Sequence, residues 1–265
     1  MRHHPRHHLR ARLRRSAAVA ACLTAAAVGL AACGTESTGT AAERSEAPKG
    51  PFAGLSGADI AQKAIAATSK ATSLRIAGKV TDEESGPMSL DMALNTSGTC
   101  AGTIGSGQGS VELRIPGPAA GGTVYMKYDE KFLRAQSKGE PAADVQAAVD
   151  MVAGRWAKTR TTSADAKEIG SFCDLDVLLA DFKDSGTLAR RGATTTVDGT
   201  PAIKLTESDG KATYTLYVAT RGKPYLLRID SRDRAAQPES LTFTDYGKPV
   251  RATPPTGDVL DLDKL

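Results

Sequence analysis

Apolar and polar residues alternate over much of the chain after residue 72. In the segment TSLRIAGKVT, residues 72–81, the apolar residues Leu74, Ile76 and Val80 alternate with polar or small ones. A period of two places every second side chain on one side of a strand, as in an antiparallel sheet with one buried face. The pattern recurs in segments 87–96, 111–115, 124–128, 155–161 and, as a meander, 194–250. We therefore predict about ten strands, each with a single apolar face.

Turn signals and side-chain phase support the meander. Asp198-Gly199 and Asp209-Gly210 are two-residue hairpin signals. Leu216 and its neighbours at alternate positions, Tyr214 and Val218, are expected on one face, and Tyr225, Leu227 and Ile229 on one face of the next strand. By the same reasoning Tyr125 and Tyr217 fall on the polar side and are expected to face water or a partner, whereas Trp156 is expected to pack.

Three segments show the period of an α-helix instead. Ser56 and Asp59 form a capping-box pattern ahead of the alanine-rich segment 58–71. Residues 142–154 place valines on one face before a glycine, and the segment LDVLLADFKD, residues 175–184, has leucines and phenylalanine at positions i, i+3, i+4 and i+7. Strands that form a meander, with helices set apart from them, indicate an α+β fold.

The strands present more apolar surface than these helices can cover. Ten strands of about 18 Å at about 4.8 Å spacing present on the order of 850 Å² on one face, while three short helices cover roughly 500 Å². The sheet must curl over the helices or leave an apolar groove, unless its own side chains fill the space. If there is a cavity, we expect it to be lined by residues of the one-faced strands: Leu74, Ile76, Leu90, Met92, Leu113 and Leu216.

The first 32 residues have the pattern of an export signal. They contain six arginines and no acidic residue, followed by an alanine-rich apolar run from Ala17 to Ala32. The run ends in Leu30-Ala31-Ala32-Cys33, which resembles the lipobox of bacterial lipoproteins, where cleavage precedes a cysteine that carries acyl chains such as palmitate. We predict a signal peptide over 1–32, lipidation of Cys33, a flexible tether over 33–53 and a folded domain over 54–265. The alternative is an ordinary signal peptide with an incidental cysteine.

Removal of this leader changes the composition. The formal charge of +4 becomes −2, with 28 basic residues against 30 acidic ones, so a nucleic-acid partner is not expected. All four histidines also leave with the leader, which excludes Ser-His-Asp and Cys-His catalysis and imidazole metal sites. We expect no enzymatic activity, no cofactor and no metal.

Cysteine count and a few short motifs complete the analysis. Cys100 and Cys173 are the two cysteines left in the exported domain besides Cys33, so we predict a disulfide between them; two buried free thiols are the alternative. The glycines of residues 102–110 predict a hairpin turn rather than a phosphate loop, because no helix pattern follows them. Three aspartates near the end of the sequence lack calcium-loop spacing and predict a solvated strand: Asp258, Asp261 and Asp263.

Several segments together resemble the LppX/LprAFG-type lipoproteins. They are the lipobox and tether, the helix leading into SLRIAGKV, the central RWAK, the hairpin VDGTPAIKL and the closing YGKPV. The resemblance covers nearly all of residues 54–265. It implies a fold similar to LolA and LolB: a strongly curved antiparallel half-barrel of about ten strands, with about three helices packed in its concave opening and an apolar cavity for acyl chains. It supplies no catalytic motif.

Two functions from different classes remain open on the sequence. The first is a monomeric lipoprotein, anchored through Cys33 to the outer face of the bacterial plasma membrane, that binds and can carry a lipid or other apolar ligand. The second is an envelope interaction or sensory module with a filled core. Flexible methionines at inward positions, among them Met92, favour the first, because methionine adapts to irregular apolar partners.

Overall fold

A computed structural model describes residues 50–82, 86–117, 122–162, 173–178, 187–208, 210–233 and 238–264. The chain divides into two units, residues 1–45 and 46–265, and every described residue belongs to the second. The expected signal peptide, Cys33 and nearly all of the tether lie outside the described residues. Within the described part, no helix is long and apolar enough to cross a membrane.

Twelve strands form one sheet in the order β12-β6-β5-β4-β3-β2-β1-β11-β10-β9-β8-β7. Neighbouring strands are antiparallel except for β12 and β6, which are parallel. The strands are β1 (Ser73–Asp82), β2 (Gly86–Asn95), β3 (Thr99–Ser106), β4 (Gly109–Pro116), β5 (Thr123–Tyr128), β6 (Trp156–Arg160), β7 (Arg190–Val197), β8 (Thr200–Ser208), β9 (Ala212–Ala219), β10 (Leu226–Asp233), β11 (Glu239–Thr244) and β12 (Leu260–Asp261). The sheet has its edges at β7 and β12 and is open, as the alternating pattern and the resemblance predicted.

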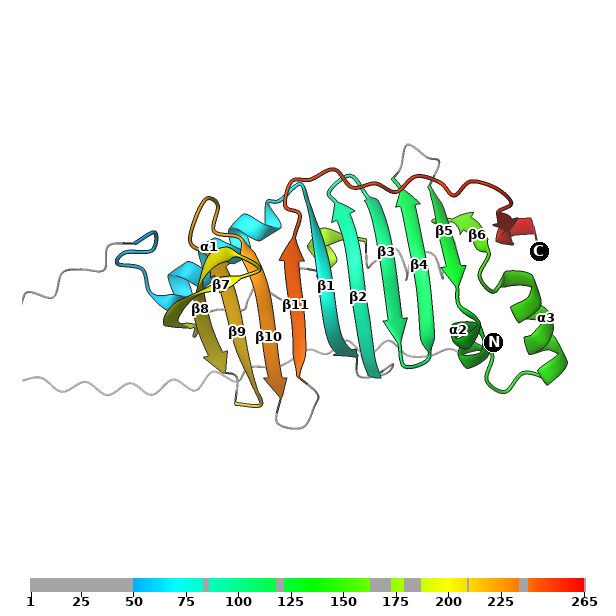
Figure 1. The fold of residues 1–265 in the computed structure, drawn as a ribbon, viewed down its shortest axis with the longest axis horizontal. Coiled ribbons are helices and arrows are strands. Elements are labelled where there is room, and N and C mark those ends of the chain that lie inside the picture. The colour runs from blue at the N-terminus through cyan, green and yellow to red at the C-terminus, as the bar shows by residue number, and fades with distance from the viewer. Residues whose placement is uncertain are drawn as a thin grey trace, which may run out of the picture. The chain divides into compact units, whose positions relative to one another are not determined.

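In the part of the chain that the structure describes, four helices and a short 3₁₀ turn accompany the sheet. They are α1 (Gly57–Ser69), α2 (Glu130–Gln136), α3 (Ala142–Val152), α5 (Leu175–Leu178) and η3 (Leu262–Lys264). Helix α1 begins at the predicted capping box, where Ser56 Oγ accepts the N–H of Asp59 at 3.1 Å and Asp59 accepts the N–H of Ser56. Its buried face packs against β7 to β10, while α2 packs against β4 and α3 (Figure 1). The structure describes only residues 175–178 of the helix predicted over 175–184.

A β-bulge in β10 changes the predicted side-chain phase of that strand. The register against β9 shifts between Leu226 and Arg228, so Leu226 and Ile229 enter the main core while Leu227 lies in a separate apolar cluster. Thr68 of α1 accepts the N–H of Leu226 at 3.0 Å, and Tyr246 donates its hydroxyl to the carbonyl of Leu226 at 2.5 Å. The expectation that Tyr225, Leu227 and Ile229 share a face was therefore wrong, because the bulge inserts a residue between them.

The chain after β11 crosses the ends of several strands before it reaches β6. This segment, orange to red in Figure 1, runs past the ends of β1 to β5 and then forms β12. It is attached near its start by two hydrogen bonds: Gly247 N–H to Ser73 O at 3.0 Å and Ser73 Oγ to Lys248 O at 2.7 Å. Strands β1 and β11, which are far apart in the sequence, are thus neighbours near the centre of the sheet.

Candidate apolar binding site

Cross-strand register arranges the inward side chains of the sheet in rows. One row contains Leu74, Leu94, Cys100 and Ile115, and the next contains Ile76, Met92, Leu113, Met126 and Phe243. A third row follows towards the β1–β2 hairpin: Leu90, Ile104, Val111, Leu241, Ile229, Leu216 and Leu205. A fourth begins with Val80, Met88 and Ser106. The alternation seen in the sequence thus forms one continuous apolar face.

Burial decreases along these rows towards the β1–β2 hairpin. The side chains of the first two rows are 0–6% exposed. In the third row Leu90, Ile104 and Leu241, on the neighbouring strands β2, β3 and β11, are only partly buried, whereas the other four side chains are 0–8% exposed. In the fourth row Val80 and Met88 are partly buried. Apolar side chains that remain accessible on an otherwise buried face are the feature expected of a site that receives an apolar ligand.

All six residues expected to line a cavity belong to one apolar cluster. Leu74, Ile76, Met92, Leu113 and Leu216 are 0–3% exposed, and Leu90 packs against the cluster while only partly buried. The inward direction predicted for them is thus the observed one. Five of the six are packed against other side chains of the protein, and Leu90 lies where accessibility begins.

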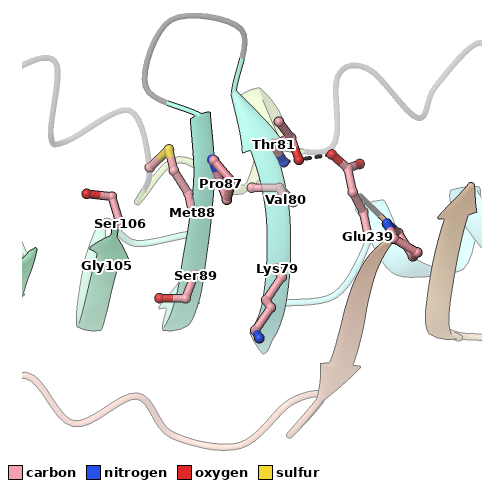
Figure 2. Close-up of a pocket in the computed structure, with 10 residues that line it drawn as sticks. Lys79, Val80, Thr81, Pro87, Met88, Ser89, Gly105, Ser106 and Glu239 are labelled. Carbon is pink, nitrogen blue, oxygen red and sulfur yellow. Dashed lines mark hydrogen bonds between the residues drawn. The ribbon is translucent and has the colours of Figure 1, made fainter. Parts of the chain in front are cut away.

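A cleft of about 390 Å³ lies at the same end of β1, β2, β3 and β11 (Figure 2). Its lining is mixed: Lys79, Val80, Thr81, Pro87, Met88, Ser89, Gly105, Ser106, Pro238 and Glu239. Glu239 Oε1 accepts the N–H of Thr81 at 2.6 Å, which orients this carboxylate along the edge of β1. Val80 and Met88 belonged to the predicted strands, but the contribution of Pro238 and Glu239 depends on pairing between distant segments and has no local sequence signal.

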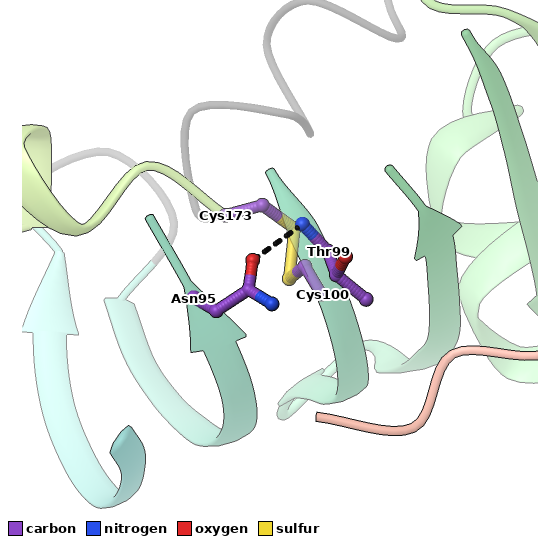
Figure 3. Close-up of a disulfide and its surroundings, with 4 residues drawn as sticks. All are labelled: Asn95, Thr99, Cys100 and Cys173. Carbon is purple, nitrogen blue, oxygen red and sulfur yellow. Dashed lines mark hydrogen bonds between the residues drawn. A yellow bond between two sulfur atoms is a disulfide. The ribbon is translucent and has the colours of Figure 1, made fainter. Parts of the chain in front are cut away.

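The disulfide predicted from the cysteine count is present in the structure (Figure 3). Cys100 lies in β3 on the inner face, fully buried, and its Cα is 5.5 Å from that of Cys173, which precedes α5. Asn95 Oδ1 accepts the N–H groups of Ser97 and Thr99, at 3.0 and 2.9 Å, and so fixes the β2–β3 turn immediately before Cys100. The bond attaches residues 173–178 to the inner face, where Leu175 joins the apolar core.

The outer face carries polar clusters beside the small separate apolar cluster that includes Tyr217 and Leu227. Tyr217 is 9% exposed, and its ring lies 4.4 Å from the guanidinium of Arg228, so the expectation that it faces water was wrong. Tyr217 Oη, Arg228 Nη2 and Ser240 Oγ all donate to the carboxylate of Asp230, at 2.7–2.9 Å. Burial acts to raise the pKa of Asp230, but these three hydrogen bonds outweigh it and lower that pKa below its usual value.

Trp156 packs on the outer face at the far end of the sheet. The guanidinium of Arg114 lies 4.4 Å from the centroid of its ring, and the ammonium of Lys127 lies 5.3 Å away. Its expected packing role therefore takes the form of cation–π contacts. Among the described residues there is no group of three or more histidines, cysteines, aspartates or glutamates that could hold a metal ion.

Comparison by sequence finds no matching family model and no matching curated protein. Among solved structures, the chain is similar to LprF from Mycobacterium bovis, with a TM-score of 0.50 and 15% identity over 76% of this chain and 97% of LprF. It is also similar to the Mycobacterium tuberculosis lipoprotein LppX, with a TM-score of 0.44 and 14% identity over 74% of this chain and 97% of LppX. The likeness to LprF confirms the predicted fold: this chain is an α+β protein with a curved, open half-barrel similar to that of LprF.

Proposed function

We propose that this protein is an exported, membrane-anchored lipoprotein that binds a lipid or other apolar ligand on the inner face of its half-barrel. The observation that carries the proposal is the gradient of burial across that face. The rows close to the disulfide are fully buried, whereas Leu90, Ile104 and Leu241 remain partly accessible. A folded protein does not ordinarily leave three neighbouring leucine and isoleucine side chains partly accessible on the apolar face of a sheet unless something covers them.

The chemistry of this region suits an acyl chain. The accessible rows offer branched aliphatic side chains together with the flexible thioether of Met88. Burial of a methylene group contributes roughly 0.8 kcal/mol, so eight methylenes would contribute roughly 6 kcal/mol before the entropy of binding is subtracted.

Anchoring is inferred from the sequence. The basic leader, the apolar run and Leu30-Ala31-Ala32-Cys33 support cleavage before Cys33 and its lipidation. The tether of about 20 residues would then have a root-mean-square reach near 25 Å, enough to hold the domain clear of the headgroups. We place the mature domain on the outer face of the plasma membrane, as a monomer.

A direct binding experiment tests the proposal. The mature domain is titrated with a fluorescent fatty-acyl probe, and unlabelled fatty acid is then added as competitor. Saturable binding of one probe per chain, reversed by the competitor, is the expected result. Fluorescence that rises without saturation, or that the competitor does not reverse, would contradict it.

A filled core remains the second candidate, because five of the six expected lining residues are already packed against protein. In that case the half-barrel would serve as a rigid support for contacts made by its outer face. This candidate predicts that no acyl probe binds, even when the domain is fully folded.

A further inference from the structure

The segment that contains β12 lies beside β6 in a register that three ion pairs repeat. Each pair joins a residue of the β6 region to the residue 103 positions later in the sequence. The pairs are Arg155 Nη2–Asp258 Oδ2 at 2.8 Å, Lys158 Nζ–Asp261 Oδ2 at 3.3 Å and Arg160 Nε–Asp263 Oδ2 at 3.2 Å. We call these three pairs the charge ladder. The backbone pairing of β12 with β6 covers only Leu260 and Asp261, and the charge ladder repeats the same offset two residues to either side, at Asp258 before the strand and at Asp263 in η3.

Side chains of this segment lie on both faces of the sheet, in β12 and in the 3₁₀ turn η3 that follows it. Asp261 and Asp263 point to the cations on the outer face, while Leu262 between them packs against the apolar core. Thr159 Oγ1 donates to Asp263 Oδ1 at 2.8 Å and fixes that carboxylate further. The expectation of a solvated strand holds for Asp258, whose side chain is 84% exposed, but not for the other two aspartates, at 23% and 27%.

The attachment of this segment is nevertheless weak. Each ion pair includes at least one partner whose side chain is more than a third exposed, and such pairs contribute little to stability. Between Lys248 and β12 the segment makes no backbone hydrogen bond to the sheet among those that the described residues show. A two-residue strand held by exposed ion pairs, one side-chain hydrogen bond and one partly buried leucine can therefore exchange with a competitor of the same pattern.

We propose that the edge of β6 is a binding site for an extended acidic segment of another protein, and that residues 258–263 occupy this site in the unbound state. The partner would add as a parallel strand, with carboxylates at positions i, i+3 and i+5 opposite Arg155, Lys158 and Arg160. Apolar residues between the carboxylates would take the place of Leu262 at the core. Backbone pairing would supply affinity, and the spacing of the cations would supply register and selectivity. This site is separate from the proposed lipid site on the inner face.

A peptide-binding experiment on the full mature chain tests this proposal. The probe is a fluorescein-labelled peptide with the sequence of residues 257–265, GDVLDLDKL. Binding is measured by anisotropy for the wild type and for two triple variants. One carries Asp258→Lys, Asp261→Lys and Asp263→Lys, which repels the resident segment and frees the edge. The other carries Arg155→Glu, Lys158→Glu and Arg160→Glu, which reverses the edge itself.

The freed edge should bind the peptide roughly tenfold or more tightly than the wild type, because the resident segment competes at a high effective concentration. Binding should weaken as salt is raised, and the variant with the reversed edge should not bind. A peptide whose three aspartates are replaced by lysine should show the opposite preference and bind only the reversed edge. This exchange of preference also identifies a folded variant, since an unfolded chain would not discriminate between the two peptides.

Three outcomes would overturn the proposal. The first is equal affinity of the wild type and the freed-edge variant for the acidic peptide. The second is binding that does not depend on the charges of the edge. The third is a concentration-dependent dimer of the wild type that the reversed edge abolishes, because the natural occupant would then be a second copy of this chain rather than another protein.

Discussion

Substitution of Leu90 by tryptophan separates a ligand site from a filled core most sharply. In register, Leu90 has Gly78 on one side, which has no side chain, and the partly buried Ile104 on the other. A larger ring at this position can enter accessible space. Leu94, four residues after Leu90 in β2 and on the same face of that strand, is the matched control, because it is 0% exposed between Leu74 and the disulfide-bonded Cys100.

The two variants should differ in stability. Overpacking of a closed core costs about 1–3 kcal/mol, and a domain of this size loses about 2–4 °C in Tm for each kcal/mol. Leu94→Trp should therefore lower the Tm by about 2–12 °C. Leu90→Trp should lower it by less than about 2 °C, since the indole meets space rather than packed atoms.

Acyl binding should show the reverse order. An indole at position 90 would exclude about four methylene groups of a bound chain, which corresponds to about 3 kcal/mol and roughly 100-fold weaker binding. Leu94→Trp should bind the probe within about threefold of the wild type, because it lies outside the accessible rows. Calorimetry of the ligand-free domains and titration with the fluorescent probe give both quantities. Equal destabilisation by the two variants, in a protein that never binds the probe, would refute the lipid site.

Three further predictions concern the disulfide, the outer face and the anchor. Cys100→Ala with Cys173→Ala should lower the free energy of unfolding by about 4 kcal/mol, as the chain-entropy model gives for a separation of 73 residues; thiol labelling of the unfolded, unreduced wild type should find no free cysteine, and two labels would contradict the bond. Asp230→Ala should cost about 1–3 kcal/mol, because three donors lose their acceptor, without changing probe binding. Because the pKa of Asp230 is lowered in the folded state, ionised Asp230 contributes to the free energy of unfolding above about pH 4. The wild type should lose this contribution as the pH falls through that pKa, whereas Asp230→Ala lacks it at every pH; parallel acid-unfolding curves of the two proteins would contradict this. Cys33→Ala should release the protein from membranes or leave it unprocessed, and unchanged mature size with membrane retention would refute lipidation.

The alternation of side chains predicted most of the sheet, because a half-buried strand imposes a period of two on its own sequence. It missed β3, where Gly102 and Gly105 replace inward and outward side chains to make room for Met92 and Ser89 of the neighbouring strand. It also missed α2, whose seven residues are too few to establish a helical period. The available signal was Asp129, an N-cap residue whose side chain accepts the N–H of Phe132 in the structure.

Features that depend on tertiary contacts could not be predicted from local pattern. Tyr217 lies on the polar side of its strand, as its phase indicated, but is covered by Arg228 of β10 through a contact between strands. The register of β12 against β6 depends on two segments about 100 residues apart and on the charge ladder between them. Which end of the apolar face remains accessible depends on the segments that pack over the other rows. Only Leu90 among the expected lining residues lies at that end.

Native mass spectrometry of the protein purified from its own membrane tests the central claim most directly. The account predicts a mass above that of the acylated polypeptide, with the excess lost after organic extraction and recovered in the extract as an acyl-containing lipid. The acylated polypeptide alone, with no extractable lipid from a domain that is fully folded, would contradict it.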